Sequence, residues 1–198
     1  MKKIYVIGGM GAGKSSVSHR LADKGFPLID LDKLGHEIHS WDVVKDDLKK
    51  EFGDGIFDAD GSINRRELAR LAFASPAATR HLNRITQPRI EELLAACLDE
   101  CEKQGNGFCV VECSVLRSRT YSIAYYADVV LAVTAPLDER IRRCVASGFD
   151  EADVRARIER QISDVDRVAM ADFVFENNGT LEELLAKVDA WWEEFSRQ

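Results

Sequence analysis

The chain has 198 residues, of which 45% are hydrophobic and 31% are charged, and its formal net charge is -7. A chain of this length folds as one domain of ordinary size, or as a core domain with an inserted subdomain. The acidic balance argues against a nucleic-acid-binding protein, which usually presents a basic face. It says little against a small anionic ligand, because a few Arg and Lys residues can form a positive pocket on an acidic protein. No stretch approaches the roughly 18 apolar residues that cross a membrane, so we expect no membrane contact.

The cysteines and the N-terminal segment predict the cellular compartment in which the protein works. The apolar run before the first glycines is too short for a secretory signal, and the five cysteines are odd in number. This combination predicts reduced thiols in the cytoplasm. Cys97 and Cys101 lie four residues apart in a helical pattern, and Cys109 and Cys113 bracket an apolar run. Neither pair has C-x-x-C zinc spacing, so we expect core packing.

Short apolar runs separated by helical patterns recur along the whole chain. The runs predict strands at residues 3–7, 27–30, 108–112, 128–133 and 172–176. Helical spacing predicts helices at 14–24, 33–53, three within 64–104, and others at 136–145, 151–170 and 180–195. Strands that alternate with helices predict an α/β fold, with a five-stranded parallel sheet flanked by helices on both faces.

Two segments stand apart from the predicted sheet and its helices. Residues 58–105 contain no strand pattern and predict a mostly helical insertion between the second and third strands. Residues 136–165 follow the fourth strand and are rich in arginine. The predicted core is therefore discontinuous, and comprises residues 1–57, 106–135 and 166–198.

A glycine-rich loop joins the first predicted strand to the first helix, and it fits the pattern G-x-x-x-x-G-K-[ST]. Its backbone N–H groups can turn toward phosphate oxygens, and the positive end of the following helix points at them. Lys14 is expected to reach the β- and γ-phosphates, and the Ser15 hydroxyl to ligate Mg²⁺. The loop therefore predicts binding of a nucleoside triphosphate. The expected ATP-binding residues are Gly8, Gly9, Gly11, Ala12, Gly13, Lys14, Ser15 and Ser16.

Carboxylates follow the second and third predicted strands, at the edge where open parallel sheets bind ligands. Phosphoryl transfer needs a group that orients and deprotonates the acceptor, and carboxylates that hold the water shell of the metal. We expect Asp32 to take the first role and Glu112 the second, through water. Asp30 has a catalytic or metal role as one interpretation and a helix cap as the other.

Seven arginines lie between residues 140 and 167, interleaved with acidic residues. One interpretation is a solvated helix face with many ion pairs. The other is a lid, residues 136–165, whose guanidinium groups close over the transferring phosphate. The place of the segment after the fourth strand, and its turn at residues 146–148, favour the lid. We expect Arg142 and Arg157 to be the phosphate partners.

The chain resembles the dephospho-CoA kinase family nearly end to end. Members of that family phosphorylate the ribose 3′-hydroxyl of dephospho-CoA, the last step of coenzyme A biosynthesis. Beyond the glycine loop, the resemblance is carried by Asp30-Leu31-Asp32 with His36, by residues 60–65, by Gly148, Arg157-Ile158 and Gln161, and by Arg167, Asn177 and Gly179.

The resemblance implies a P-loop kinase fold in which the helical insertion receives the pantetheine-bearing substrate. It implies a magnesium-dependent and ATP-dependent transferase that acts in the cytoplasm on dephospho-CoA. It also implies that Asp32 is the base facing the 3′-hydroxyl, and that Asn177 lies near the adenine of ATP.

The chain departs from the usual family pattern at three places. Gln87 stands where the family usually has histidine, residues 112–118 replace a loop that usually begins Asp-x-Pro, and Ala146 replaces a lid arginine. The first two lie where the acceptor should bind, so a kinase for another nucleotide or small metabolite is an alternative. A nucleotide-binding protein with weak or no transfer activity is a third reading, against which the retained Asp32 argues.

Overall fold

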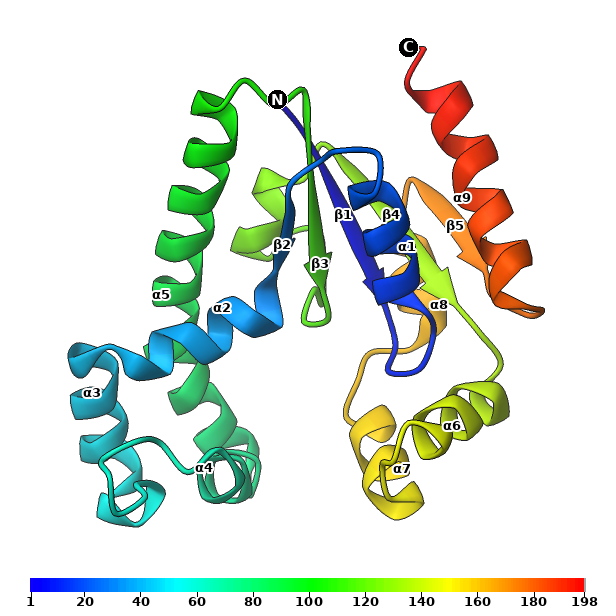
Figure 1. Ribbon diagram of the computed structural model, residues 1–198. Coiled ribbons are helices and arrows are strands. Elements are labelled where there is room, and N and C mark those ends of the chain that lie inside the picture. The colour runs from blue at the N-terminus through cyan, green and yellow to red at the C-terminus, as the bar shows by residue number, and fades with distance from the viewer. Residues whose placement is uncertain (198) are drawn as a thin grey trace. The chain divides into compact units, whose positions relative to one another are not determined.

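The computed structural model describes residues 1–197 and shows an α/β fold built on one five-stranded sheet (Figure 1). The strands are β1 (Lys2–Gly8), β2 (Leu28–Asp30), β3 (Phe108–Cys113), β4 (Val129–Thr134) and β5 (Phe173–Glu176). All four pairings are parallel, in the order β2-β3-β1-β4-β5. The predicted parallel sheet is confirmed, and each predicted strand end lies within one residue of the observed end.

β1 is the central strand, and helices cover both of its faces. Its residues 4–7 are at most 2% exposed, which explains why the strand reads as an uninterrupted apolar run. Helices α1 (Lys14–Ala22) and α9 (Leu181–Phe195) pack together on one face, and α8 (Asp164–Met170) contacts β1 and β4 on the other (Figure 1). This packing holds the end of β1 and the start of α1, and so positions the loop between them.

The core between the sheet and α9 is rich in aromatic rings. The ring of Trp192 lies 4.8 Å from that of Phe26 and 4.9 Å from that of Phe108, centroid to centroid. Trp191 stacks on Phe195 at 4.7 Å. These rings, most of them partly buried, pack against the core of the sheet and remove apolar surface from water, which stabilises the contact between the sheet and α9.

The contacts divide the chain into two compact units. Unit 1 contains Met1–Asp30 and the chain from Leu98 onward, and unit 2 is Leu31–Cys97. The divisions fall at the end of β2 and inside α5 (Pro76–Lys103). Unit 2 begins earlier in the chain than the predicted insertion at residues 58–105. The division into core, insertion and lid stays a prediction.

In unit 1, the longest connection between strands is the one from β4 to β5. A 3-10 helix, η3 (Ser122–Tyr126), lies between β3 and β4. Three helices, α6 (Leu137–Ala146), α7 (Glu151–Glu159) and α8, lie between β4 and β5. The single helix predicted at 151–170 is therefore two helices. The break is explained by Ser163, which caps α8 by accepting a hydrogen bond from the Asp166 backbone N–H at 3.1 Å.

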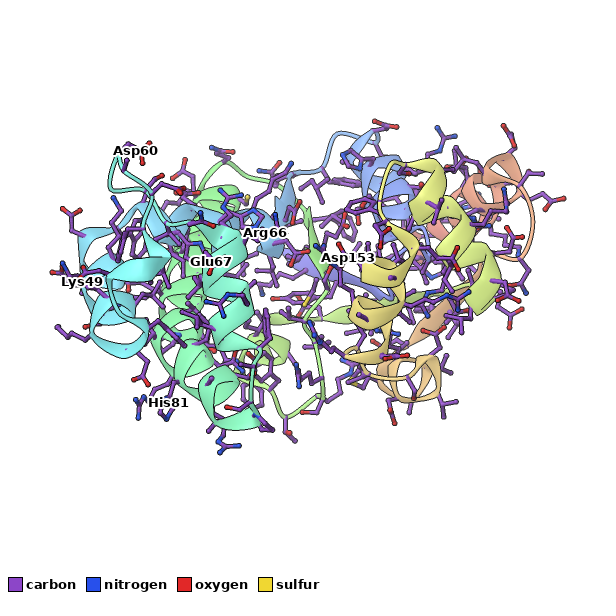
Figure 2. The ribbon with its side chains drawn as sticks, turned by 90° about the horizontal axis from the view of Figure 1, so that it is seen from below. Lys49, Asp60, Arg66, Glu67, His81 and Asp153 are labelled. Carbon is purple, nitrogen blue, oxygen red and sulfur yellow. The ribbon has the colours of Figure 1, made fainter. Side chains whose placement is uncertain are left out.

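Unit 2 is built from helices and turns around its own apolar core. Its elements are α2 (Leu31–Glu37), η1 (Ile38–Ser40), α3 (Asp42–Phe52), η2 (Asp54–Ile56), α4 (Arg65–Ala72) and the first part of α5. Ile38, Leu48 and Ile56 are fully buried in that core. Lys49 and His81 lie on the outside of the unit (Figure 2).

Two predictions of helix boundaries in unit 2 are wrong. The helix predicted at 33–53 is interrupted, because Trp41 takes an extended conformation with φ -74° and ψ 128°. The break predicted before Pro88 does not occur, and α5 passes through that proline, so two helices replace the three predicted. A proline removes only one helical hydrogen bond, and packing of Ile85 and Ile90 on the core holds the helix around it.

None of the helices described over residues 1–197 has the length and apolar character needed to cross a membrane.

Candidate active site

The loop from Gly8 to Lys14 has the backbone of a phosphate cradle. Gly11 and Gly13 have positive φ angles of 75° and 105°, which residues with a Cβ rarely adopt. No side chain caps the N-terminus of α1, so its first N–H groups are available to an anion. The predicted setting, a glycine loop between a buried strand and a helix, is confirmed.

Neighbouring elements lie directly against this loop. A Cβ atom at Gly9 would come within 2.0 Å of Arg140 Nη2, and one at Gly11 within 2.4 Å of the Arg140 carbonyl oxygen. A Cβ atom at Gly8 would meet Lys14 Cγ at 2.8 Å, so the lysine side chain folds back over the loop. Lys14 is 9% exposed. Glycine at these positions therefore serves close packing as well as conformation.

The two residues predicted to support magnesium are in contact. The Ser15 hydroxyl donates a hydrogen bond to Glu112 Oε1 at 2.7 Å. Glu112 lies near the carboxyl end of β3, in register with Val6 of β1 and Asp30 of β2. Mg²⁺ usually binds one or two protein oxygens together with waters and substrate phosphates. A hydroxyl and a carboxylate at the start of α1 fit that requirement.

Within residues 1–197, no group of three or more His, Cys, Asp or Glu side chains could hold a metal ion by itself. Ser16, predicted to bind ATP, is the third residue of α1 and is half-buried.

An arginine that the sequence analysis did not select lies at the P-loop. Arg140 of α6 is 5% exposed, and its Nε donates to the Met10 carbonyl oxygen at 2.9 Å. Its Nη2 donates to Gln161 Oε1 at 3.3 Å, and its Nη1 contacts Asp164 Oδ2 at 3.3 Å. Arg140 shares the buried face of α6 with Ile141 and Cys144, but the sequence alone does not show that this face is the buried one.

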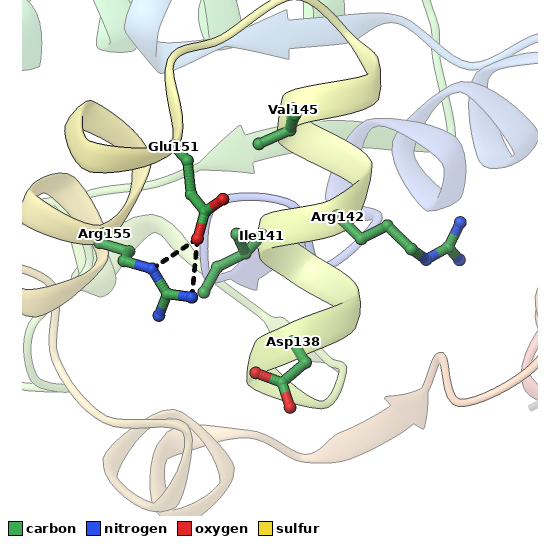
Figure 3. Close-up of a pocket in the computed structure, with 6 residues that line it drawn as sticks. All are labelled: Asp138, Ile141, Arg142, Val145, Glu151 and Arg155. Atoms are coloured by element: carbon green, nitrogen blue, oxygen red, sulfur yellow. Dashed lines mark hydrogen bonds and ion pairs between the residues drawn. The ribbon is translucent and has the colours of Figure 1, made fainter.

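The two arginines predicted as phosphate partners point elsewhere. Arg142 is 68% exposed and pairs with Glu139 at 2.5 Å, an interaction that lowers the pKa of Glu139. It lines a cavity of about 300 Å³ between α6 and α7, whose α7 side carries the i,i+4 ion pair of Glu151 with Arg155 (Figure 3).

Arg157 is exposed and lies over the ring of Phe149, with Cζ 5.9 Å from the centroid. In the described chain, neither Arg142 nor Arg157 hydrogen-bonds to the P-loop. Arg142 therefore fits the solvated-face interpretation in this conformation.

Asn177 supports the P-loop from the far side. It follows β5, is 6% exposed, and donates from Nδ2 to the Ala12 carbonyl oxygen at 2.9 Å. A Cβ atom at Gly13 would lie 2.6 Å from that Nδ2. Arg143 Nη2 donates to the Asn177 carbonyl oxygen at 3.2 Å. The Asn177 side-chain amide thus holds the backbone of the nucleotide loop, and its place near adenine stays a prediction.

The Asp-x-Asp motif lies where the two units join in the chain. Asp30 ends β2 in unit 1, and α2 begins at the next residue, so Asp30 occupies the position expected of a helix cap. Asp32 lies in the first turn of α2, in unit 2, and is exposed. An exposed carboxylate at the carboxyl end of a strand is accessible to a substrate.

A parallel sheet of this strand order, with a phosphate cradle after its central strand, defines a P-loop kinase. Solved structures support this class at the level of the fold. Shikimate kinase from Bacteroides thetaiotaomicron matches with a TM-score of 0.53 and 14% identity, over 98% of each chain. Dephospho-CoA kinase from Campylobacter jejuni matches with a TM-score of 0.66 and 18% identity, over 100% of this chain and 98% of its own.

Within that class, the chain belongs to the dephospho-CoA kinase family. The model of that family, described as CoaE: Dephospho-CoA kinase, matches residues 3–183. The dephospho-CoA kinase of Corynebacterium jeikeium (strain K411) is 40% identical over 194 residues, which cover 97% of this chain and 98% of its own. The dephospho-CoA kinase of Thermobifida fusca (strain YX) is 35% identical, over 100% of this chain and 98% of its own. The solved structure of TT1252 from Thermus thermophilus matches with a TM-score of 0.81 and 30% identity, over 98% of this chain and 97% of its own. The family inferred from the motifs is confirmed.

Proposed function

We propose that the protein transfers the γ-phosphoryl group of ATP to the 3′-hydroxyl of dephospho-CoA, forming coenzyme A and ADP. The observation that carries this proposal is the contact of 2.7 Å between the Ser15 hydroxyl and Glu112 at the start of α1. It joins the metal-binding end of the P-loop to a strand-end carboxylate, in a chain of the dephospho-CoA kinase family.

The nucleotide would bind along the P-loop, with its phosphates at backbone N–H groups of the loop and the Lys14 ammonium group at the β- and γ-phosphates. Ser15, and Glu112 through water, would hold Mg²⁺, which when bound neutralises charge on the phosphates. Gly8 and Gly9 let Lys14 and Arg140 pack closely against the backbone of the loop. Ser16 and Asn177 would be the remaining residues of the ATP-binding site. The proposed role of Asn177 near adenine is compatible with its hydrogen bond to Ala12.

Asp32 would orient the acceptor hydroxyl and accept its proton as the phosphoryl group leaves ATP. Its support is its exposure and its place after β2. Arg142 and Arg157 would approach the phosphates by leaving their present partners, Glu139 and Phe149, as the lid closes. The helices of unit 2 would receive the pantetheine-bearing part of the substrate. The odd number of cysteines, all free thiols, supports a cytoplasmic location.

The function is tested by measuring ADP formation with dephospho-CoA, adenosine, AMP and pantothenate as separate acceptors, with mass spectrometry of each product. We expect turnover of about 1–100 s⁻¹ with dephospho-CoA alone. The Lys14→Ala variant, purified in the same way, controls for contaminating kinases.

Turnover confined to another acceptor would instead support a kinase for a different nucleotide or metabolite, for which the altered loop at residues 112–118 gives a reason. ATP binding without transfer to any acceptor would support a nucleotide-binding protein.

A further inference from the structure

Gln161, a half-buried residue in the segment between α7 and α8, is the meeting point of part-buried hydrogen bonds beside the P-loop. Its Oε1 accepts from the Met10 backbone N–H at 3.0 Å and from Arg140 Nη2 at 3.3 Å. Arg167 Nη2 approaches the same oxygen at 3.5 Å. One side-chain oxygen therefore contacts the nucleotide loop, α6 and α8 together.

The two arginines at this oxygen are an unusual pair, because both are buried. Arg140 is 5% exposed and Arg167 is 2% exposed. Asp164 lies between them, with Oδ1 at 2.6 Å from Arg167 Nη1 and Oδ2 at 3.3 Å from Arg140 Nη1. Buried guanidinium groups are costly unless their N–H groups have acceptors. Asp164 can meet only part of that need, and the Gln161 oxygen supplies the next acceptor.

The same network holds Met10 from both sides. Its N–H donates to Gln161 and its carbonyl oxygen accepts from Arg140 Nε at 2.9 Å. The Met10 N–H is therefore already used by the protein, as is the Ala12 N–H, which donates to the Gly9 carbonyl oxygen at 3.1 Å. The first half of the P-loop is positioned by side chains that come from 130 and 151 residues further along the chain.

We propose that Gln161 is a positioning residue for nucleotide binding, whose side-chain oxygen sets the place of Met10 and the orientation of the Arg140 guanidinium group beside the P-loop. The proposal rests on the proposed function for its effect on turnover, but its effect on ATP affinity is independent of the acceptor. The proposed role needs an oxygen acceptor at the position of Gln161 Oε1, where it reaches the Met10 N–H and Arg140. A glutamate at position 161 also provides such an oxygen.

Three variants test this role. Gln161→Leu keeps the approximate size and removes the acceptor, Gln161→Glu keeps the acceptor, and Gln161→Asn keeps the amide but withdraws it by one methylene. The probe is Mg²⁺–ATP, titrated by calorimetry into each variant without acceptor, at a temperature well below every melting transition. Glu159→Gln, an exposed position two residues away, is the matched control.

We expect Gln161→Leu to weaken ATP binding about tenfold, because buried N–H groups are left without an acceptor. We expect Gln161→Asn to weaken it by a smaller factor, and Gln161→Glu and Glu159→Gln to bind within about threefold of the wild type. With dephospho-CoA as acceptor, kcat/KM for ATP should fall in the same order. If Gln161→Leu does not fold, the comparison of Gln161→Asn with Gln161→Glu decides.

Wild-type ATP affinity in Gln161→Leu, or in Gln161→Asn where the leucine variant does not fold, would overturn the proposal. Equal losses in the leucine and glutamate variants would also overturn it, since the oxygen acceptor that glutamate retains would then not preserve ATP affinity. A protein that shows the expected order of ATP affinities but does not phosphorylate dephospho-CoA would refute the proposed function and leave the role of Gln161 supported.

Discussion

The two units of the molecule differ in the polar and charged side chains that they bury. Six polar or charged residues are buried within residues 1–197, and five of them lie in unit 1, namely Lys14, Ser18, Arg140, Arg167 and Asn177. The sixth is Thr86 in unit 2, whose hydroxyl bonds the Leu82 carbonyl oxygen of its own helix. In unit 1, the buried groups Arg140 and Asn177 instead bond to backbone atoms of the P-loop.

The charges of unit 2 lie at its surface, and several of them pair within one helix. Asp47 with Lys50 in α3, and Arg70 with Glu67 in α4, are i,i+3 pairs at 3.1 Å and 2.8 Å. Figure 2 shows Lys49 and Glu67 among the surface side chains of these helices. Exposed pairs of this kind contribute about 0–1 kcal/mol. Unit 2 is therefore stabilised by its apolar core, whereas unit 1 also buries charge to position the nucleotide loop.

The sharpest test of this contrast concerns the Asp-x-Asp motif. We expect Asp32→Asn to lower kcat about 10²–10⁴-fold, because the amide cannot accept the proton of the acceptor hydroxyl. ATP affinity should stay near the wild-type value, since the P-loop belongs to unit 1. Steady-state kinetics and calorimetric titration with Mg²⁺–ATP measure the two quantities.

The matched control is Asp30→Asn, two residues away in unit 1. Asparagine caps helices about as well as aspartate, so the cap interpretation predicts unchanged stability and turnover. Equal loss of turnover in both variants would show that the base is not Asp32 alone.

A smaller effect is expected at the metal-supporting carboxylate of unit 1. Glu112→Gln removes the negative charge beside Ser15, so kcat should fall about 10²-fold and part of the activity should return at raised Mg²⁺ concentration. A Mg²⁺ titration of the reaction rate measures this. Asp99→Asn, an exposed position of unit 1 paired with Lys103 at 3.6 Å, should titrate like the wild type. An unchanged Mg²⁺ dependence in Glu112→Gln would exclude the carboxylate from metal support.

The next effect in size concerns the buried amide behind the P-loop. Asn177→Ala leaves the Ala12 carbonyl oxygen without its donor, and loss of such a partner costs about 1–3 kcal/mol. We expect ATP to bind about tenfold more weakly. Asn178→Ala is the control, because Asn178 is exposed and donates to the neighbouring Glu176 at 3.3 Å rather than to the P-loop. Equal ATP affinity in the two variants would contradict the support role of Asn177.

The smallest expected effect is a pH-dependent contribution to stability between α1 and α9. Hydrogen bonds from Arg20 and Lys24, at 2.6 Å and 2.8 Å, lower the pKa of Asp189 to about 2. A lowered carboxyl pKa stabilises the folded state above the unfolded value near 4, and this contribution disappears as the pH falls toward 2. Because the Asp189 side chain is 28% exposed, solvent screening reduces the contribution to about 1 kcal/mol.

We therefore expect Asp189→Asn to lower the free energy of unfolding by about 1 kcal/mol at pH 7, and by progressively less as the pH approaches 2. Urea denaturation across this pH range measures it. Asp47→Asn, which breaks an exposed pair in unit 2, should have no measurable effect. A difference for Asp189→Asn that did not shrink at low pH would show that the ion pairs are not its source.

The elements that the sequence predicted well are those determined by neighbouring residues. Each strand is a short apolar run, and the P-loop is a pattern of glycines followed by Lys14 and Ser15. The predicted break before Pro88 failed for the opposite reason, because distant packing of Ile85 and Ile90 outweighs a local signal. Local propensity is a weak prior wherever tertiary contacts oppose it.

The arginines show the same limit within the candidate site. The arginine-rich segment predicted that some guanidinium group reaches the phosphates, but composition does not show which helix face is buried. Arg140 lies against the P-loop, while Arg142, two residues away, points to solvent beside Glu139. On an α-helix, residues two apart point in different directions, so the packing of α6 made this choice.

The sequence by itself determined the phosphate loop, the parallel sheet and the family, because each follows from residue types at short spacing. Only the tertiary structure decided that β3 pairs with β1, which brings Glu112 to Ser15 from 97 residues away. It also decided that Gln161 and Asn177 hold the backbone of the P-loop from distant parts of the chain. Strand order and buried hydrogen bonds depend on how the whole chain packs, and no local pattern of residues encodes them.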